Sequence, residues 1–127
     1  METTIVKIAP IRLEWCEWVK WEDLKVDARR GGIVVPNRIS GVYEVKYENS
    51  DERLTIGKAS NLRHRIKQCL VKGKSPHSAG KHIREHEGVS RLIVRWACTD
   101  RPACAEEELH RIYLNKFGSL PKYVKHT

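Results

Sequence analysis

The sequence lacks the features that direct a protein into a membrane or the secretory pathway. No apolar run approaches the roughly 20 residues that a helix needs to cross a bilayer. The first residues, Met1-Glu2-Thr3-Thr4, have neither the basic stretch nor the apolar core of a secretory signal. We therefore expect a cytoplasmic protein that has no membrane partner.

Cysteine motifs, internal repeats and low-complexity segments are also absent. The four cysteines, at positions 16, 69, 98 and 104, include no C-x-x-C pair of the kind found in zinc knuckles and redox motifs. Without a secretory context, a disulfide framework is not expected. Cys69 and Cys98 each fall on an apolar face of a predicted element, so we interpret both as small core residues.

What is present fits one soluble globular domain. The chain has 127 residues, enough for one modest hydrophobic core and too few for two. Hydrophobic residues make up 40% and charged residues 31%, a balance typical of soluble proteins.

Acidic residues are missing from one long stretch of the chain. Lysine and arginine number 24 against 16 acidic residues, which gives a net charge of +8, yet no acid occurs between positions 58 and 84. Such a one-sided stretch favours contact with the phosphates of a nucleic acid, and a solvated basic helix face is the alternative. The cations expected to bind nucleic acid are Lys58, Arg63, Lys67, Lys72, Lys74 and Lys81.

Hydrophobic periodicity predicts an α+β fold. Alternation predicts strands over 41–47, 53–57 and 92–98, the first two joined by a polar turn. Leu62, Ile66, Cys69 and Leu70 have helical spacing, and Gly73 is a plausible stop. A short helix is expected over 82–86. A last helix should open at Pro102 and end at Gly118, with Ala105, Leu109 and Ile112 on its apolar side and Tyr113 as a further candidate there. These elements predict a small three-stranded, mainly antiparallel sheet flanked by helices.

Residues 1–40 form an aromatic-rich lead-in that we expect to pack on the domain of residues 41–127. Trp15, Trp18 and Trp21 recur at a spacing that suits one side of a helix, whereas Ile11, Leu13 and Trp15 alternate as in a short strand. Both interpretations stay open. In either case the tryptophans are expected to cover one edge of the core.

Four patterns follow one another in a fixed order along the chain. Gly41-Val42-Tyr43 opens the first strand, and Thr55-Ile56-Gly57 closes the second. Arg65 follows Gly57 by eight residues within the basic helix, and Glu106 lies early in the last helix, three positions before Leu109. In this order and spacing the patterns resemble the GIY-YIG nuclease family, and the resemblance extends from Ser40 to Tyr123.

The resemblance implies a metal-dependent endonuclease that hydrolyses phosphodiester bonds. Glu106 would hold one divalent cation, Mg²⁺ or Mn²⁺, which keeps several waters and accepts a phosphate oxygen as ligand. Arg65 would grip phosphate oxygens, and Tyr43 would position or deprotonate the attacking water. His77 would donate to the phosphate or assist proton transfer. No small-molecule cofactor is expected, and DNA is favoured as the partner by resemblance alone.

Three departures from the family pattern keep an alternative open. Thr55 stands where the family has its second tyrosine, and Cys69 stands where relatives often have a histidine. Val124 follows Tyr123 where relatives often have an asparagine. The alternative is a domain that binds nucleic acid without efficient cleavage. A third class, a protein-interaction module built on the tryptophans of the lead-in, has less support. His82 and His86 stand four residues apart, and we interpret them as a solvated helix face. The sequence leaves the oligomeric state open.

Overall fold

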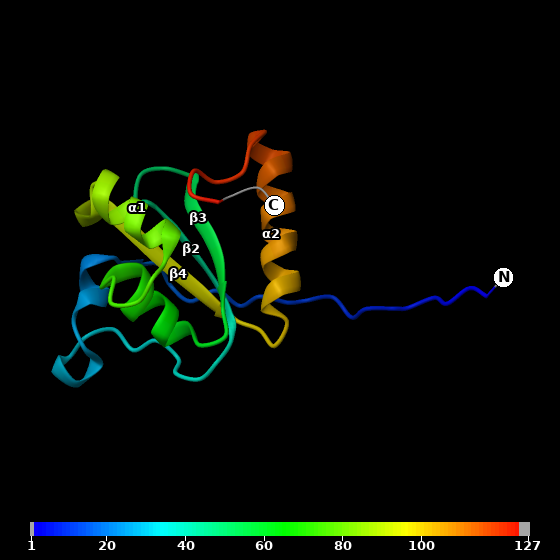
Figure 1. The fold of residues 1–127 in the computed structure, drawn as a ribbon, viewed down its shortest axis with the longest axis horizontal. Helices are drawn as coiled ribbons and strands as arrows, with labels where there is room; N and C mark the ends of the chain where they lie inside the picture. Colours follow the sequence, from blue (N-terminus) through cyan, green and yellow to red (C-terminus); the bar gives the residue numbers. More distant parts are fainter. Residues whose placement is uncertain (1, 125–127) are drawn as a thin grey trace.

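A computed structural model describes residues 2–124 as a four-stranded antiparallel sheet between helices (Figure 1). The strands are β1 (Val19–Lys20), β2 (Gly41–Tyr47), β3 (Arg53–Ala59) and β4 (Leu92–Cys98), in the spatial order β1-β4-β2-β3. Three helices pack against the sheet, namely the π-helix η3 (His64–Val71), α1 (Ser78–His86) and α2 (Pro102–Phe117). Single 3-10 turns are η1 (Glu22–Lys25), η2 (Ala28–Arg30) and η4 (Val89–Arg91). The predicted α+β class is confirmed.

The prediction of three strands is wrong by one. β2 and β3 form the expected hairpin, and β4 pairs with the other side of β2. The additional strand, β1, pairs Val19 with Val94 along the outer side of β4. Two residues are too few to show the alternation from which a strand is predicted, so β1 was not predictable.

Neither interpretation of the lead-in is confirmed, because residues 11–18 form no helix and no strand, and β1 begins only at Val19. The backbone N–H of Cys16 donates to the carbonyl of Trp96 at 3.0 Å, which holds the segment against β4. Trp21 is fully buried in the main core, as expected of a tryptophan that covers the core edge. Trp15 and Trp18 instead flank the guanidinium of Arg95, which lies 4.2 Å and 4.6 Å from their ring centres. Cation–π attraction of this kind fixes the segment on the sheet.

The two faces of the sheet bury different side chains, because successive residues of a strand point to opposite sides. Tyr43, Val45 and Val94 belong to the larger core, which η3 and α1 cover. Val42 and Ala97 belong to a smaller core with Ala105 of α2. Figure 1 shows α1 on one side of the strands and α2 on the other.

The two cysteines predicted to be core residues behave differently. Cys69 is buried, which confirms one prediction. Cys98 is exposed, so the other is wrong. Cys98 is the last residue of β4, where the opposite residue, Gly41, has no side chain to cover it.

The helix ends follow the expected signals. Asn61 Oδ1 accepts from the N–H of His64 at 3.4 Å, and Gly73 leaves the helical region with φ +69° after η3. Pro102 opens α2, and Gly118 ends it with φ +79°. The predicted α1 is longer than expected at its N-terminal end, where it begins at Ser78.

The inward face of α2 differs from the prediction in one position. Ile112 was expected in the core but is 51% exposed, and Tyr113 is buried in its place. The hydroxyl of Tyr113 accepts from the N–H of Arg53 at 3.1 Å, so the helix turns this side toward β3. Within residues 2–124, no helix has both the length and the apolar character that a membrane span requires.

Candidate active site

The candidate site begins with a close approach between β2 and β3. Tyr43 lies opposite Gly57 in the hairpin and is 2% exposed. A Cβ atom at position 57 would lie 2.4 Å from the Tyr43 hydroxyl oxygen, and 2.5 Å from the ring carbon that carries it. The tyrosine ring therefore crosses the backbone of Gly57, and only glycine leaves room for it. This crossing carries the phenol from β2 to β3, which is the outer strand of the sheet.

His77 holds the phenol from the other direction. It is the N-cap residue of α1, and its Nδ1 accepts from the backbone N–H of Gly80 at 2.8 Å. An Nδ1 that accepts carries no proton, so the proton of the neutral ring lies on Nε2. Nε2 is 2.8 Å from the Tyr43 hydroxyl oxygen and donates to it. The hydrogen bond from Gly80 thus fixes the tautomer of His77, and this tautomer makes His77 the donor and Tyr43 the acceptor.

The protonation states of this pair follow from burial. Burial, with the charges of Arg65 and Arg84, lowers the pKa of His77 to about 4. Burial likewise raises the pKa of Tyr43 well above its usual range. Both groups are therefore neutral near pH 7 in the metal-free protein. Because Tyr43 accepts from His77, its own O–H is available as a donor to a third group.

Arg65 stands beside this pair on η3. Its positive charge opposes the rise in the pKa of Tyr43 and lowers the pKa of His77, so the guanidinium lies within electrostatic range of both. Among residues 2–124, no ion-pair partner of Arg65 is found, and its side chain is partly exposed. A partly exposed guanidinium of this kind can donate two N–H groups to the oxygens of an incoming phosphate.

α2 brings the carboxylate of Glu106 to the same edge. His110 Nε2 hydrogen-bonds the carbonyl of Ile56 at 2.8 Å, and Tyr113 bonds Arg53, so this side of α2 is attached along β3. Glu106 precedes His110 by one helical turn on that side, and its negative charge raises the pKa of Tyr43. The side chain is half-buried, and no ion-pair partner for it is found within residues 2–124.

Four side chains, each from a different element, therefore act on one another. The phenol of Tyr43 from β2 is hydrogen-bonded to the imidazole of His77 at the start of α1, and its pKa responds to the guanidinium of Arg65 from η3 and the carboxylate of Glu106 from α2. The sequence singled out all four. It did not indicate His110, whose attachment to β3 sets the position of Glu106, because a backbone carbonyl partner leaves no trace in a sequence pattern.

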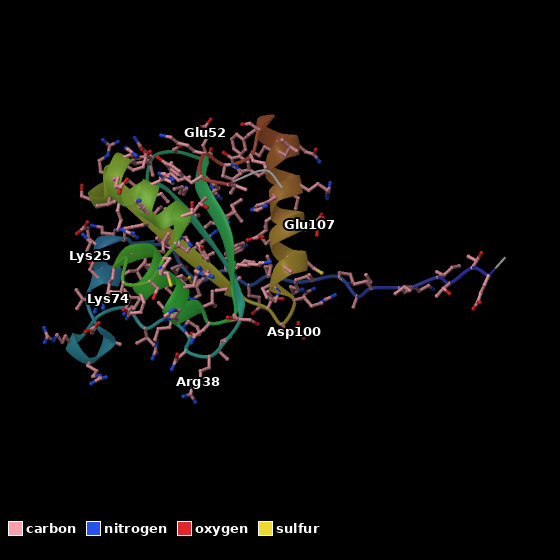
Figure 2. All side chains as sticks on the ribbon, in the orientation of Figure 1. Lys25, Arg38, Glu52, Lys74, Asp100 and Glu107 are labelled. Atoms are coloured by element: carbon pink, nitrogen blue, oxygen red, sulfur yellow. The ribbon has the colours of Figure 1, made fainter. Side chains whose placement is uncertain are left out.

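The cations predicted to bind nucleic acid divide into two groups. Lys58, Lys74 and Lys81 are exposed, and Figure 2 shows Lys74 at the surface of the side that carries η3. The other three are engaged within the fold. Lys72 pairs with Asp27, Arg63 Nε donates to the carbonyl of Val35 at 2.8 Å, and Lys67 Nζ donates to that of Val26 at 3.0 Å.

Lys67 departs furthest from its predicted role. It is only 4% exposed, and burial lowers its pKa. It ties η3 to the end of η1 rather than facing solvent. Two cations that the sequence did not single out, Arg29 and Arg30 of η2, line a surface depression together with Arg63, Lys72 and Lys74. The chain separates these two groups by more than thirty positions, which is why the sequence did not join them.

Thr55 and Cys69, singled out in the sequence, are both buried. Thr55 lies opposite Val45 in the hairpin, at 3% exposure. Cys69 lies on η3, within electrostatic range of Tyr43, whose pKa it raises.

A second group of possible metal ligands does not form a site that we assign. His82, Glu85 and His86 place one ligand atom each within 4.8 Å of one another, but all three side chains are exposed on α1. His82 also stacks on Tyr123. Exposed histidine and glutamate side chains at helical spacing commonly have no metal, in agreement with the solvated face expected from the sequence.

No family model, curated protein or solved structure matches this chain significantly. The chemistry of the site is therefore inferred from the geometry of the chain itself.

Proposed function

We propose that this protein is a metal-dependent endonuclease with a GIY-YIG-like fold that hydrolyses phosphodiester bonds in DNA. One observation carries the proposal, namely that the buried Tyr43 is hydrogen-bonded to His77 and lies within electrostatic range of both Arg65 and Glu106. Phosphodiester hydrolysis needs a positioned water, a held phosphate and a group that offsets charge on the leaving oxygen. The four side chains supply groups suited to each task.

Glu106 fits a single hard divalent cation. It offers carboxylate oxygens, it is half-exposed, and its charge has no ion-pair partner among residues 2–124. Mg²⁺ is commonly held by one or two carboxylates and keeps several waters, and Mn²⁺ takes similar ligands. When bound, such a cation supplies charge stabilisation to the phosphate oxygens.

The remaining residues act on the substrate directly. Arg65 binds the non-bridging phosphate oxygens with two N–H groups. Tyr43, fixed by the hydrogen bond from His77, directs its O–H toward the nucleophile or the phosphate. Because the free protein keeps Tyr43 protonated, its role there is to position a group rather than to remove a proton. His77 is thus a positioning residue for Tyr43.

The substrate must be a polyanion that spans the exposed cations. Lys58 is exposed immediately after Gly57 on β3, and Lys74 and Lys81 are exposed on the loop and helix that follow η3. Contacts to phosphates at these positions would release counterions and make the affinity fall with salt. DNA is proposed as this polyanion because the sequence resembles the GIY-YIG nuclease family.

A plasmid-nicking assay with Mg²⁺ tests the proposal. Glu106→Gln keeps the size of the side chain and removes its charge, so we expect a loss of at least about a hundredfold in cutting rate. Glu107→Gln is the matched control, because Glu107 is exposed on the side of α2 away from the sheet (Figure 2) and should leave the rate unchanged. Equal rates for the wild type and Glu106→Gln would rule out the proposed metal ligand.

A second candidate function is supported by the buried Thr55. A threonine at 3% exposure cannot offer the phenol that the family has at this position, so the domain would bind nucleic acid without efficient cleavage. In that case the wild type binds DNA with a salt-dependent affinity and nicks the plasmid no faster than Glu106→Gln. Absence of binding to duplex, branched and single-stranded DNA would remove both candidates.

A further inference from the structure

Three surface depressions follow one another around the end of η3, and each shares cationic side chains with the next. The first lies between η2 and η3 and shares Lys72 and Lys74 with the second. The second shares Lys74 and Arg84 with the third, which His77 lines at the start of α1. Because His77 is hydrogen-bonded to Tyr43, the three depressions, here called the basic path, lead from η2 to the candidate active site.

The charged side chains of the basic path are almost all positive. Within the described residues 2–124, Asp27 is the one acid that lines the path, and it is paired with Lys72. Arg29, Arg30 and Lys74 are exposed, and no ion-pair partner for them is found in this part of the chain. Three exposed cations beside a single paired acid give the path a positive charge that favours a polyanion.

η2 is held on η3 by three cations that the sequence predicted to bind nucleic acid. Before the turn, Lys67 donates to the carbonyl of Val26, and Lys72 pairs with the N-cap residue of η2. After the turn, Arg63 donates to the carbonyl of Val35. The two arginines of η2 are therefore carried by a turn that is attached to η3 on both sides, which reduces the entropy lost when they bind a ligand.

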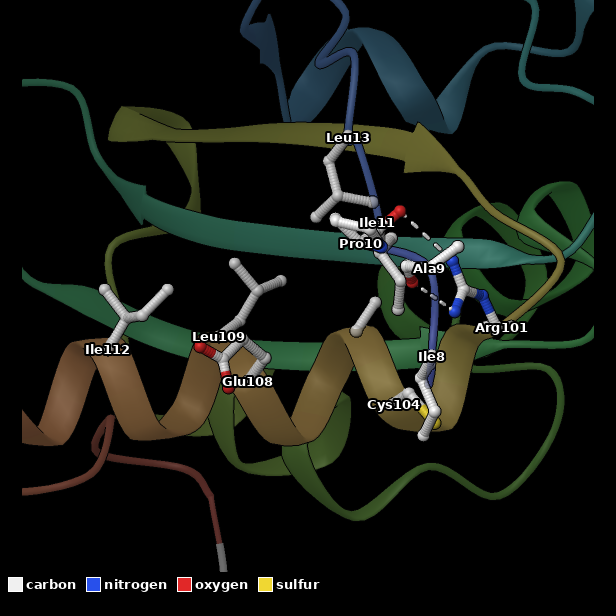
Figure 3. Close-up of a pocket in the computed structure, with 11 residues that line it drawn as sticks. Ile8, Ala9, Pro10, Ile11, Leu13, Arg101, Cys104, Glu108, Leu109 and Ile112 are labelled. Carbon is white, nitrogen blue, oxygen red and sulfur yellow. Dashed lines mark hydrogen bonds between the residues drawn. The ribbon is translucent and has the colours of Figure 1, made fainter. Parts of the chain in front are cut away.

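The depression beside α2 differs from the basic path. Figure 3 shows apolar side chains along it, among them Ile11 and Leu109. Arg101, which also lines it, donates to two carbonyls of the lead-in, at 2.7 Å and 3.3 Å, and Glu108 pairs with Arg111. These charged groups are engaged within the fold, so the arginines of η2 are better placed to bind an external ligand.

The two ends of the basic path lie on different sides of η3. Arg63 and Lys67 bond to carbonyls on either side of η2, whereas Arg65, between them in the sequence, acts on Tyr43 and His77. A helix with its side chains is about 10–12 Å across, and successive phosphates of one strand advance about 3.4 Å along a duplex. A ligand that contacts both sides of η3 is therefore a chain of several nucleotides rather than a single phosphate.

We propose that η2 is a second contact for the nucleic-acid substrate, where Arg29 and Arg30 bind backbone phosphates several nucleotides away from the bond that is cut. The identity of the ligand rests on the proposed function, and the location of the contact rests on the basic path. Guanidinium groups suit this role because each can donate two N–H groups to phosphate oxygens. Both arginines belong to the lead-in, so this contact comes from outside the part of the chain that resembles the nuclease family.

Fluorescence-anisotropy titrations of a labelled duplex at several salt concentrations, without added metal, test this contact apart from catalysis. Arg29→Gln/Arg30→Gln should reduce the slope of log affinity against log salt by about 2, because each lost phosphate contact removes about 0.9. Arg12→Gln/Lys20→Gln is the matched control, since it removes the same charge from two exposed positions of the lead-in outside the basic path. The control should keep the slope of the wild type.

A charge-conserving variant guards against a loss of structure in η2. Arg29→Lys/Arg30→Lys keeps both charges, so it should retain most of the slope that the glutamine variant loses. Equal slopes for the glutamine variant and the control, beside a wild type that binds, would overturn the η2 contact and leave the proposed function intact.

A reduced slope in a protein that nicks no plasmid would support the η2 contact and contradict the proposed cleavage. A wild type that does not bind the duplex would overturn both.

Discussion

At the scale of single residues, the candidate site depends on the close approach of Tyr43 to Gly57 and on which nitrogen of His77 carries the proton. The sequence predicted Tyr43, Arg65 and Glu106 from their joint order and spacing, and His77 from the resemblance to the GIY-YIG nuclease family. The contact between His77 and Tyr43 was not predictable, since it depends on where the N-cap of α1 comes to rest against β2. The burial of Lys67 was equally hidden, because its partner is a backbone carbonyl of a loop far away in the chain.

The passage of Tyr43 across Gly57 leads to a prediction at this scale. Gly57→Ala would place a methyl group 2.4 Å from a hydroxyl that is buried and held by His77. We expect a loss of about 1–3 kcal/mol in the free energy of unfolding, typical of overpacking in a core. Nicking activity should fall with it, because the phenol is displaced. Urea unfolding and the plasmid assay measure the two effects.

The control for this substitution is Gly88→Ala. A Cβ at position 88 meets nothing within 4 Å, and its φ of −80° suits any residue. Its free energy of unfolding should change by no more than about 0.5 kcal/mol. If Gly57→Ala were as stable and active as Gly88→Ala, the assigned path of the Tyr43 ring would be wrong.

At the scale of elements, long periodic segments were predictable and irregular ones were not. The hairpin, β4, η3 and α2 carry clear alternation or helical spacing, and all four were predicted. The π-type winding of η3 leaves no such signal, although it is visible in the N–H of Lys72 donating to the carbonyl of Lys67, five residues earlier, at 2.9 Å. Charge patterns showed that η3 is basic, but not which of its cations face solvent.

Replacing a lysine with methionine should have different effects at the buried position 67 and at the exposed position 81. Lys67→Met removes the donor to the Val26 carbonyl, so we expect a loss of about 1–2 kcal/mol of stability and an unchanged salt dependence of DNA affinity. Lys81→Met, at an exposed position of α1, should leave stability unchanged. It should weaken DNA binding and reduce the slope of log affinity against log salt by about 1. Urea unfolding and fluorescence-anisotropy titrations at several salt concentrations test both variants. The reverse assignment of effects would contradict the roles given to these two lysines.

At the scale of the whole molecule, the lead-in and the C-terminal segment complete the domain. The sequence placed residues 1–40 outside the family resemblance, yet β1 extends the sheet, and Trp21, Leu24 and Val35 are fully buried in the main core. At the other end, Glu87 accepts from the hydroxyls of Tyr47 at 2.7 Å and Tyr123 at 2.5 Å. It also accepts from Lys122 Nζ at 2.7 Å, so one carboxylate joins β2, the end of α1 and the chain after α2.

This junction should make the stability of the molecule depend on pH. Burial alone would raise the pKa of Glu87, but hydrogen bonds from Lys122, Tyr123 and Tyr47 outweigh it and lower the pKa to about 2. Because the folded pKa lies below the ordinary value of 4.5, the stabilisation is complete above that value and is lost as the pH falls toward 2. After allowance for solvent screening, we expect Glu87→Gln to lower the free energy of unfolding by about 1–2 kcal/mol near pH 7 and by progressively less in acid.

Urea unfolding of both proteins across this pH range measures the difference, and Glu85→Gln, at an exposed position of α1, is the control. If the difference in the free energy of unfolding between the wild type and Glu87→Gln stayed constant from pH 7 down to about pH 2, the charge of Glu87 would not stabilise the junction.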